Sequence, residues 1–187
     1  MNDAFYKNTI AMIESIEDCL EKRRILPCLV LLYTGLDVMA SLDRQSSESS
    51  KAAFLRWVDK YFLKARPLAC TATELYAARC GVLHTLTAES DLSRQGRARM
   101  LIYAWGNAAV DDLAKTAALL KRDDLVSVHV RDLIDAFRSG IAEYVQELDG
   151  DTQRQDFVAR RAGLWFTNMQ PDVIRRFIDQ HEIHGAS

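Results

Sequence analysis

The sequence lacks several features that would place it in a common class of protein. No glycine-rich phosphate-binding loop is present, which argues against a nucleotide triphosphatase or a dinucleotide-binding fold. The cysteines at Cys19, Cys28, Cys70 and Cys80 include no C-x-x-C pair, so we expect free and mostly buried thiols. No apolar signal-peptide region is visible, and the longest apolar run, residues 25–33, is far shorter than the ~20 residues of a membrane span. We therefore expect a cytoplasmic protein with no membrane partner.

Strong charge of either sign is also absent. The 187 residues carry a formal net charge of -2, with 24 Lys and Arg against 26 Asp and Glu. A protein that binds nucleic acid without specificity is usually basic, so any such contact here must come from a local cluster of arginines. The chain is 49% hydrophobic and 27% charged, which is ordinary for a globular protein. We predict a single domain over residues 1–187.

Hydrophobic residues recur at helical spacing through the first half of the sequence. The second predicted helix is apolar on nearly every side, which is typical of a helix at the centre of a core, and Gly35 within it indicates a close neighbour. The polar stretch 43–50 is typical of a surface loop. The predicted helices of this half span residues 4–23, 26–39, 51–63 and 71–86, the last capped by Thr71 or Thr73.

The second half combines two short β-type segments with further helices. Residues 98–105 are rich in β-branched and aromatic side chains, and residues 125–130 alternate valine with other residues, although a helix starting at Val128 is an open alternative. We expect the two segments to pair as a small antiparallel ribbon. The other predicted helices span residues 107–121, with Asn107 as the cap, and 131–148, 152–166 and 171–183. The predicted fold class is mainly α, a helical bundle with a small two-stranded antiparallel ribbon.

The fourth predicted helix carries a pattern that indicates chemistry. In Arg79-Cys-Gly-Val-Leu-His84 an arginine stands five residues before a histidine. A guanidinium is permanently charged and can bind a phosphate through two N–H groups at once, and an imidazole can transfer protons near neutral pH. Together, near a two-fold axis, these two groups are suited to RNA cleavage.

This R-x4-H spacing on a helix resembles the signature of the HEPN superfamily (higher eukaryotes and prokaryotes nucleotide-binding domains). The resemblance covers roughly residues 4–86, a HEPN-like core on which residues 98–187 pack. One position differs, because the residue after the arginine is commonly Asn, Asp or His in the family and is Cys80 here. The resemblance implies a homodimer of four- to five-helix bundles that cuts RNA without a metal or other cofactor. It also implies a toxin–antitoxin or phage-defence setting, with an antitoxin or nucleotidyltransferase-like partner.

The resemblance assigns roles to the residues of this helix. His84 would take the proton from a ribose 2′-hydroxyl or protonate the leaving 5′-oxygen, and Arg79 would stabilise the charge on the phosphoryl oxygens. The product of that route is a 2′,3′-cyclic phosphate. Cys80 lies beside Arg79 in the sequence, and Tyr76 and Thr85 are candidate donors that position the phosphate. We therefore predict supporting roles for these three residues.

The spacing also predicts how two copies would meet. Five residues at 3.6 per turn place Arg79 and His84 about 140° apart around the helix, so we expect them not to share a face in one subunit. Ala77, Gly81 and His84 do share a face, and the two small residues would admit the helix of a symmetry mate. In that homodimer the long Arg79 side chain would reach round to a shared cleft.

Other features of the sequence leave alternatives open. Arg94, Arg97 and Arg99 follow the motif and are either part of a solvated loop or the basic rim of an RNA-binding site. His181 and His184 have no third ligand nearby, so no metal site is predicted.

Two other functions remain open. A non-catalytic HEPN-like module would bind a nucleotide, RNA or a protein. A plain helical oligomerisation protein would have Arg79 salt-bridged within one subunit, for example to Glu74 or Glu89, and His84 buried.

Overall fold

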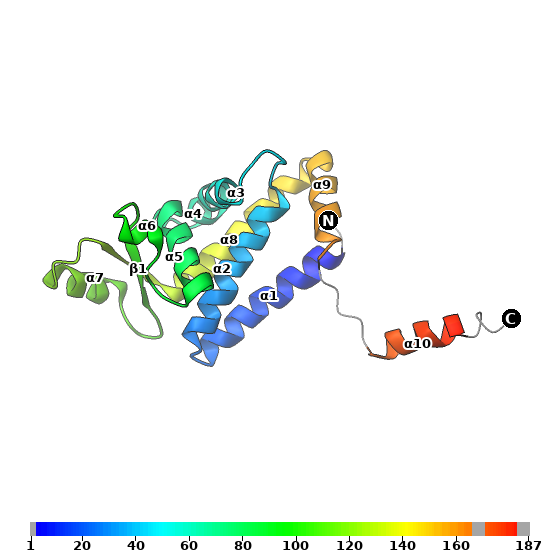
Figure 1. The fold of residues 1–187 in the computed structure, drawn as a ribbon, viewed down its shortest axis with the longest axis horizontal. Coiled ribbons are helices and arrows are strands. Elements are labelled where there is room, and N and C mark those ends of the chain that lie inside the picture. The colour runs from blue at the N-terminus through cyan, green and yellow to red at the C-terminus, as the bar shows by residue number, and fades with distance from the viewer. Residues whose placement is uncertain (1–2, 166–170, 183–187) are drawn as a thin grey trace.

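The protein is mainly helical, as the sequence predicts, with one small sheet at one end of a bundle (Figure 1). The computed structural model describes residues 3–165 and 171–182. The elements are α1 (Asp3–Glu21), α2 (Ile25–Leu42), α3 (Ser50–Trp57), a π-helical segment η1 (Val58–Phe62), α4 (Leu63–Ala65), α5 (Ala72–Thr85), α6 (Asp91–Arg94), β1 (Met100–Ala104), α7 (Val110–Leu119), β2 (Leu125–His129), α8 (Val130–Asp149), α9 (Thr152–Ala162) and α10 (Pro171–Glu182).

Helix α2 is the centre of the bundle, because other helices pack on it from several sides. It packs against α1, α3, α5 and α8, and Leu32, Tyr33 and Leu36 are fully buried. A Cβ built on Gly35 would lie 2.6 Å from Cζ of Phe137 in α8, so this ring is the close neighbour expected at the glycine. By length and composition alone, with a mean hydropathy of 1.9, α2 is also apolar enough to cross a membrane, and half of it is buried inside the fold.

The run expected as one helix over residues 51–63 contains a wider turn. The α-helix α3 passes into η1, whose π-helical backbone leads into α4. Helix α8 packs closely here, because a Cβ built on Gly140 would lie 3.1 Å from Cα of Phe62. The ring of Trp57 contacts Phe137, and Tyr61 contacts Tyr144. Aromatic side chains of both α3 and η1 therefore pack on α8. Helix α8 lies outside residues 4–86, the segment expected to form the core, and it is nevertheless part of the bundle.

The strand pair is parallel, so the expected antiparallel ribbon is wrong in orientation. β1 and β2 pair in register from Met100 opposite Leu125 onward. Helix α7 connects the end of β1 to the start of β2, and a crossover containing a helix is the usual link between parallel strands, whereas antiparallel strands need only a tight turn. The helix predicted between the two strands is itself the signal for parallel pairing. That helix starts later than expected, with Ala109 as its N-cap, and Asn107 lies in the exposed turn before it.

A tyrosine pair ties the sheet to the bundle. The hydroxyl of Tyr33 in α2 lies 2.8 Å from that of Tyr103 in β1. Burial raises the pKa of both phenols, so each stays neutral and serves only as a hydrogen-bonding group. The sheet is therefore fixed against the middle of α2.

The polar stretch 43–50 is the surface loop that its composition suggests, except that its first residue, Asp43, is only 3% exposed. Arg154 of α9 donates to the Asp43 carboxylate from Nε at 2.9 Å and from Nη2 at 2.5 Å. Arg56 of α3 donates to the same carboxylate at 3.3 Å and to the Asp43 carbonyl at 3.0 Å. The Tyr61 hydroxyl accepts a further bond from Arg154 at 2.7 Å. Asp43 therefore joins the end of α2 to α3 and α9.

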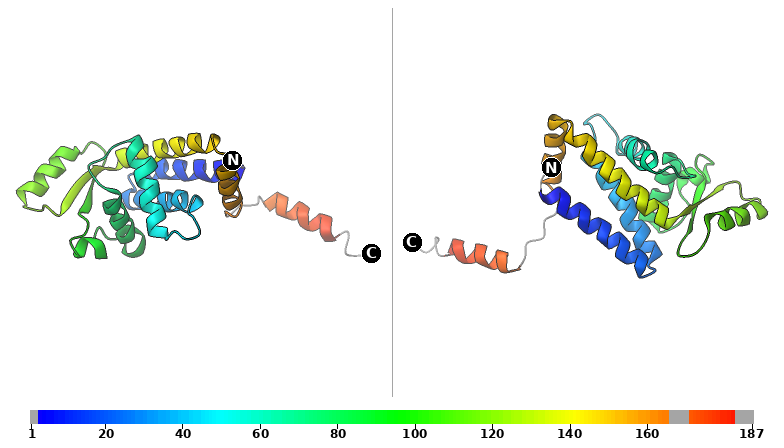
Figure 2. Two further views of the ribbon diagram at one scale, coloured as in Figure 1. Left: turned by 90° about the horizontal axis from the view of Figure 1, so that it is seen from above. Right: turned by 180° about the vertical axis from the view of Figure 1, so that it is seen from behind.

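Helix α10 lies apart from the bundle, at the end of the molecule opposite the strand pair (Figure 2). It matches the helix predicted over residues 171–183. Its apolar residues Val173, Ile174, Phe177 and Ile178 are each more than 40% exposed. The amphipathic helix thus presents its apolar face to solvent.

Candidate active site

Helix α5 positions the predicted catalytic pair. It begins with a capping box, in which the Thr71 hydroxyl accepts from the Glu74 backbone N–H and the Glu74 carboxylate accepts from the Thr71 backbone N–H. It ends at Leu86, whose φ of 55° places it in the left-handed region. Both ends confirm the helix predicted over residues 71–86. Between them, Arg79 is half-buried and His84 is exposed.

Arg79 is held by an acid that the sequence did not indicate. Its Nε donates to Oδ2 of Asp37 at 2.7 Å, and its Nη2 lies 2.5 Å from the same oxygen. Both side chains are less than one-third exposed, so water screens this pair only partly. Burial alone would lower the pKa of Arg79, but Asp37 outweighs burial and the net shift is upward. Asp37 therefore fixes one edge of the guanidinium fork and keeps it charged.

The third nitrogen of the guanidinium contacts the histidine. Nη1 of Arg79 lies 3.0 Å from Nε2 of His84 within one chain. The sequence predicts that the two residues do not share a face of the helix, yet their side chains meet within one subunit. Their α-carbons do lie on different sides of the helix, but the long arginine side chain spans the difference.

This contact constrains the protonation of His84. A guanidinium only donates hydrogen bonds, so Nη1–H donates and Nε2 accepts. The neutral ring then carries its proton on Nδ1. In the absence of substrate, the lone pair on Nε2 is therefore held by Arg79, and a group that displaces Nη1 would release it.

The three predicted supporting residues lie at different distances from the guanidinium. The ring of Tyr76 lies 6.0 Å from Cζ of Arg79, and the sulfur of Cys80 lies 4.0 Å from its Nη1. The pKa of the Tyr76 phenol is raised, mainly by burial and to a smaller extent by the neighbouring Cys80. Thr85 instead donates to the carbonyl of Gly81 at 2.9 Å, on the side of the following loop. Tyr76 and Cys80 therefore border Arg79, whereas the Thr85 hydroxyl is engaged elsewhere.

A small polar cavity lies beside the Asp37–Arg79 pair. It measures ≈ 200 Å³ and includes Arg44 and Ser50 in its lining. Arg44 donates to the Ser50 hydroxyl at 2.6 Å. Ligand pockets usually measure ~300–1,000 Å³, so this cavity suits a group the size of a phosphate rather than a whole nucleotide. It brings two guanidiniums, those of Arg44 and Arg79, to one small space.

The arginines that follow the motif are mostly engaged with acids. Arg99 forms a two-pronged ion pair with the Glu74 carboxylate at 2.5 and 3.2 Å. Burial would raise the pKa of Glu74, but Arg99 and the capping bonds outweigh it and the net shift is downward. Arg94 forms an ion pair with Asp91, and both residues belong to the short helix α6. Arg97 is exposed, and within the described residues it has no ion-pair partner.

The small-residue face of α5 is covered by the same chain. A Cβ built on Gly81 would lie 2.6 Å from the carbonyl oxygen of Thr87 and 2.8 Å from that of Glu89. Ala77 is also buried. The loop after α5 therefore occupies the place expected for the helix of a symmetry mate.

In the part of the chain that the structure describes, no group of three His, Cys, Asp or Glu side chains is arranged to hold a metal ion. His184 lies outside the described residues. Asp37 and Arg44 are the residues of the site that sequence reasoning missed, because neither belongs to a recognisable motif. No family model, curated protein or solved structure matches this chain.

Proposed function

We propose that this protein is a metal-independent endoribonuclease of the HEPN type, active as a homodimer in a toxin–antitoxin or phage-defence setting. The observation that supports it best is the line of contacts from Asp37 through Arg79 to His84. The Asp37 carboxylate binds Nε and Nη2 of the Arg79 guanidinium, and the remaining nitrogen, Nη1, contacts the His84 imidazole. This arrangement combines a phosphate-binding cation with a proton-transfer group.

The reaction would begin when the scissile phosphate displaces His84 from Nη1 of Arg79. The freed Nε2 would accept the proton of the ribose 2′-hydroxyl. The 2′-oxygen would then form a bond to phosphorus while the bond from phosphorus to the 5′-oxygen breaks. Arg79 would stabilise the negative charge on the phosphoryl oxygens, and the product would carry a 2′,3′-cyclic phosphate.

The leaving 5′-oxygen also needs a proton. One imidazole cannot accept and donate in the same step, so the acid would come from a second protomer. This need for a second proton-transfer group supports the proposed dimer. The exposed position of His84 on α5 is compatible with a partner at that side.

Replacing Asp37 with Asn is expected to lower the cleavage rate by about 100-fold, because a displacement of ~1 Å at a reacting group can cost that much. Asn keeps the shape of the side chain but removes the charge that holds Arg79. Single-turnover cleavage measures the effect. Asp37→Glu, which keeps the charge, should retain more activity than Asp37→Asn; the reverse order would contradict an anchoring role.

The proposal is tested by incubating the purified protein with labelled single-stranded RNA in EDTA. Wild type should produce fragments that end in a 2′,3′-cyclic phosphate, whereas an Arg79→Ala/His84→Ala double variant purified in the same way should not. Equal background cleavage by the two proteins would overturn the proposal.

A non-catalytic RNA-binding module is the second candidate. It is favoured by the same 3.0 Å contact, because Arg79 occupies the nitrogen that a base needs. In that case the RNA would bind to wild type and remain intact, and the double variant would bind it more weakly.

A further inference from the structure

A second, larger cavity lies at the opposite end of α2 from the Asp37–Arg79 pair. It measures ≈ 540 Å³, within the range of ~300–1,000 Å³ that is usual for ligand pockets. Three segments line it: the α1–α2 turn with Arg23, the β1–α7 turn with Trp105 and Gly106, and the β2–α8 junction with His129 and Arg131. No residue of the Arg79–His84 pair belongs to it.

The cavity lies at the carboxyl ends of the two parallel strands. β1 ends at Ala104 and β2 at His129, and these two residues are paired in the register. In open α/β units, ligands bind outside the carboxyl ends of the strands, where the loops leave the sheet. The parallel orientation, which places both strand ends on one side, therefore creates the site.

Trp105 offers an aromatic face at this edge. Its side chain is 43% exposed, although most large apolar side chains of the protein are buried. Gly106, with a φ of 62°, forms the turn directly after it. Base stacking on an exposed aromatic ring is the common way in which proteins hold single-stranded nucleic acid.

His129 fixes the turn that carries Trp105. Its Nδ1 accepts from the backbone N–H of Arg131 at 3.1 Å, and its Nε2 lies 3.3 Å from the carbonyl oxygen of Gly106. Because a carbonyl only accepts, Nε2 carries the proton, and one neutral tautomer satisfies both contacts. The histidine thus joins the start of α8 to the β1–α7 turn.

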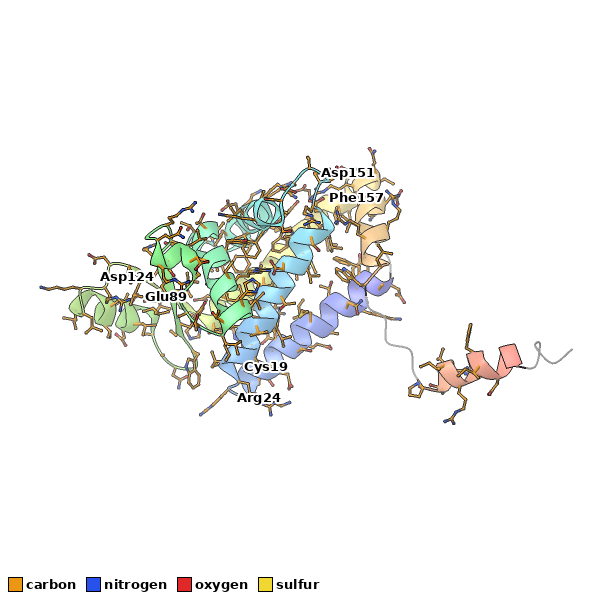
Figure 3. All side chains as sticks on the ribbon, viewed as in Figure 1. Cys19, Arg24, Glu89, Asp124, Asp151 and Phe157 are labelled. Carbon is orange, nitrogen blue, oxygen red and sulfur yellow. The ribbon has the colours of Figure 1, made fainter. Side chains whose placement is uncertain are left out.

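Two guanidiniums, those of Arg23 and Arg131, also belong to the lining of the cavity. Arg23 is exposed and, among the residues that the structure describes, has no ion-pair partner. Arg131 uses Nη1 to bind Glu17, and the described contacts leave its other nitrogens unused. Glu21 is the acid in the lining, so two guanidiniums face one carboxylate. Arg24 lies at the tip of the same turn (Figure 3).

We propose that this cavity binds a nucleotide unit, with the base stacked on Trp105 and the phosphate between Arg23 and Arg131. This inference deepens the proposed function, because the unit would belong to the single-stranded RNA that reaches Arg79. The 12 steps along α2 from Ile25 to Asp37 span about 18 Å at 1.5 Å per residue, a distance that a short RNA strand can bridge.

The test is the binding of a fluorescein-labelled oligonucleotide whose riboses are 2′-O-methylated. This strand lacks the attacking hydroxyl, so its binding does not depend on catalysis. In fluorescence anisotropy, Trp105→Leu is expected to weaken binding by roughly 5- to 100-fold and Trp105→Phe by much less, because phenylalanine keeps a stacking face. Arg23→Gln should lower the slope of log affinity against log salt by about 0.7. Arg160→Gln, which removes an exposed arginine from α9, is the matched control and should leave the slope unchanged.

AMP as a competitor separates the two sources of the ligand. Displacement of the strand by AMP only at high concentration assigns the site to RNA, whereas tight binding of AMP that Trp105→Leu abolishes assigns it to a free nucleotide. Equal affinity of wild type and Trp105→Leu for both probes would overturn the inference. Cleavage of unmodified RNA that persists in that case would leave the proposed function standing, so the two failures are distinguishable.

Discussion

A His84→Ala variant is expected to cleave RNA about 100- to 10,000-fold more slowly than wild type, the range typical of losing a general acid or base. The change removes Nε2, which lies 3.0 Å from Nη1 of Arg79, while Asp37 continues to hold the other edge of the guanidinium. RNA affinity should therefore fall much less than the rate. Single-turnover cleavage in EDTA gives the rate, and anisotropy with the 2′-O-methylated strand gives the affinity.

Stability separates this chemical effect from a structural one. His84 is exposed, so its replacement should change the free energy of unfolding by no more than ~0.5 kcal/mol. Gln95→Ala, on the exposed loop after α6, is a control that should keep the wild-type rate. A His84→Ala protein that is equally stable and equally active would remove the imidazole from the mechanism.

An Asp43→Ala variant is expected to lose about 3 kcal/mol of unfolding free energy. The change leaves the guanidiniums of Arg56 and Arg154 without their shared carboxylate, and removing one partner from a buried ion pair costs ~3–5 kcal/mol. The lower end of that range applies because Arg56 is 36% exposed and retains Glu48 as a partner. Urea denaturation followed by circular dichroism measures the loss.

Two further variants show whether the ion cluster is the cause. Asp123→Ala removes an exposed acid from the turn before β2 and should change stability by no more than ~0.5 kcal/mol. Arg154→Met combined with Asp43→Ala should be less destabilising than the sum of the two single changes, because the residues share one interaction. Additive effects would show that packing alone explains the loss.

Local signals in the sequence predicted most of the helices. The apolar periodicity of residues 131–148 matches α8 within a residue at each end, and Thr71 with Glu74 forms the capping box expected at the start of α5. Both strands also lie where β-branched and aromatic residues gather. These features depend on neighbours a few residues away, which the sequence displays directly.

The parts that could not be predicted depend on distant residues. Asp37 meets Arg79 across 42 positions, and Asp43 meets Arg154 across 111. A lone aspartate at the end of an apolar helix carries no pattern that names its partner, and the polar composition of residues 43–50 concealed a buried charge. The motif indicated Arg79 and His84 as candidate site residues, whereas the acid that binds Arg79 became visible only in three dimensions.

Both ends of the segment between α5 and β1 are fastened. At one end, the backbone N–H of Thr87 donates to the Gly81 carbonyl at 3.2 Å, and at the other, Arg99 is clamped by Glu74. Between them, a Cβ built on Gly96 would have no atom within 4 Å. Because doubling the length of a flexible loop costs only ~0.6 kcal/mol, extra peptide spliced in at Gly96 would leave both anchors in place. This position therefore suits an epitope or fluorophore tag that reports on α5 from a short distance without altering it.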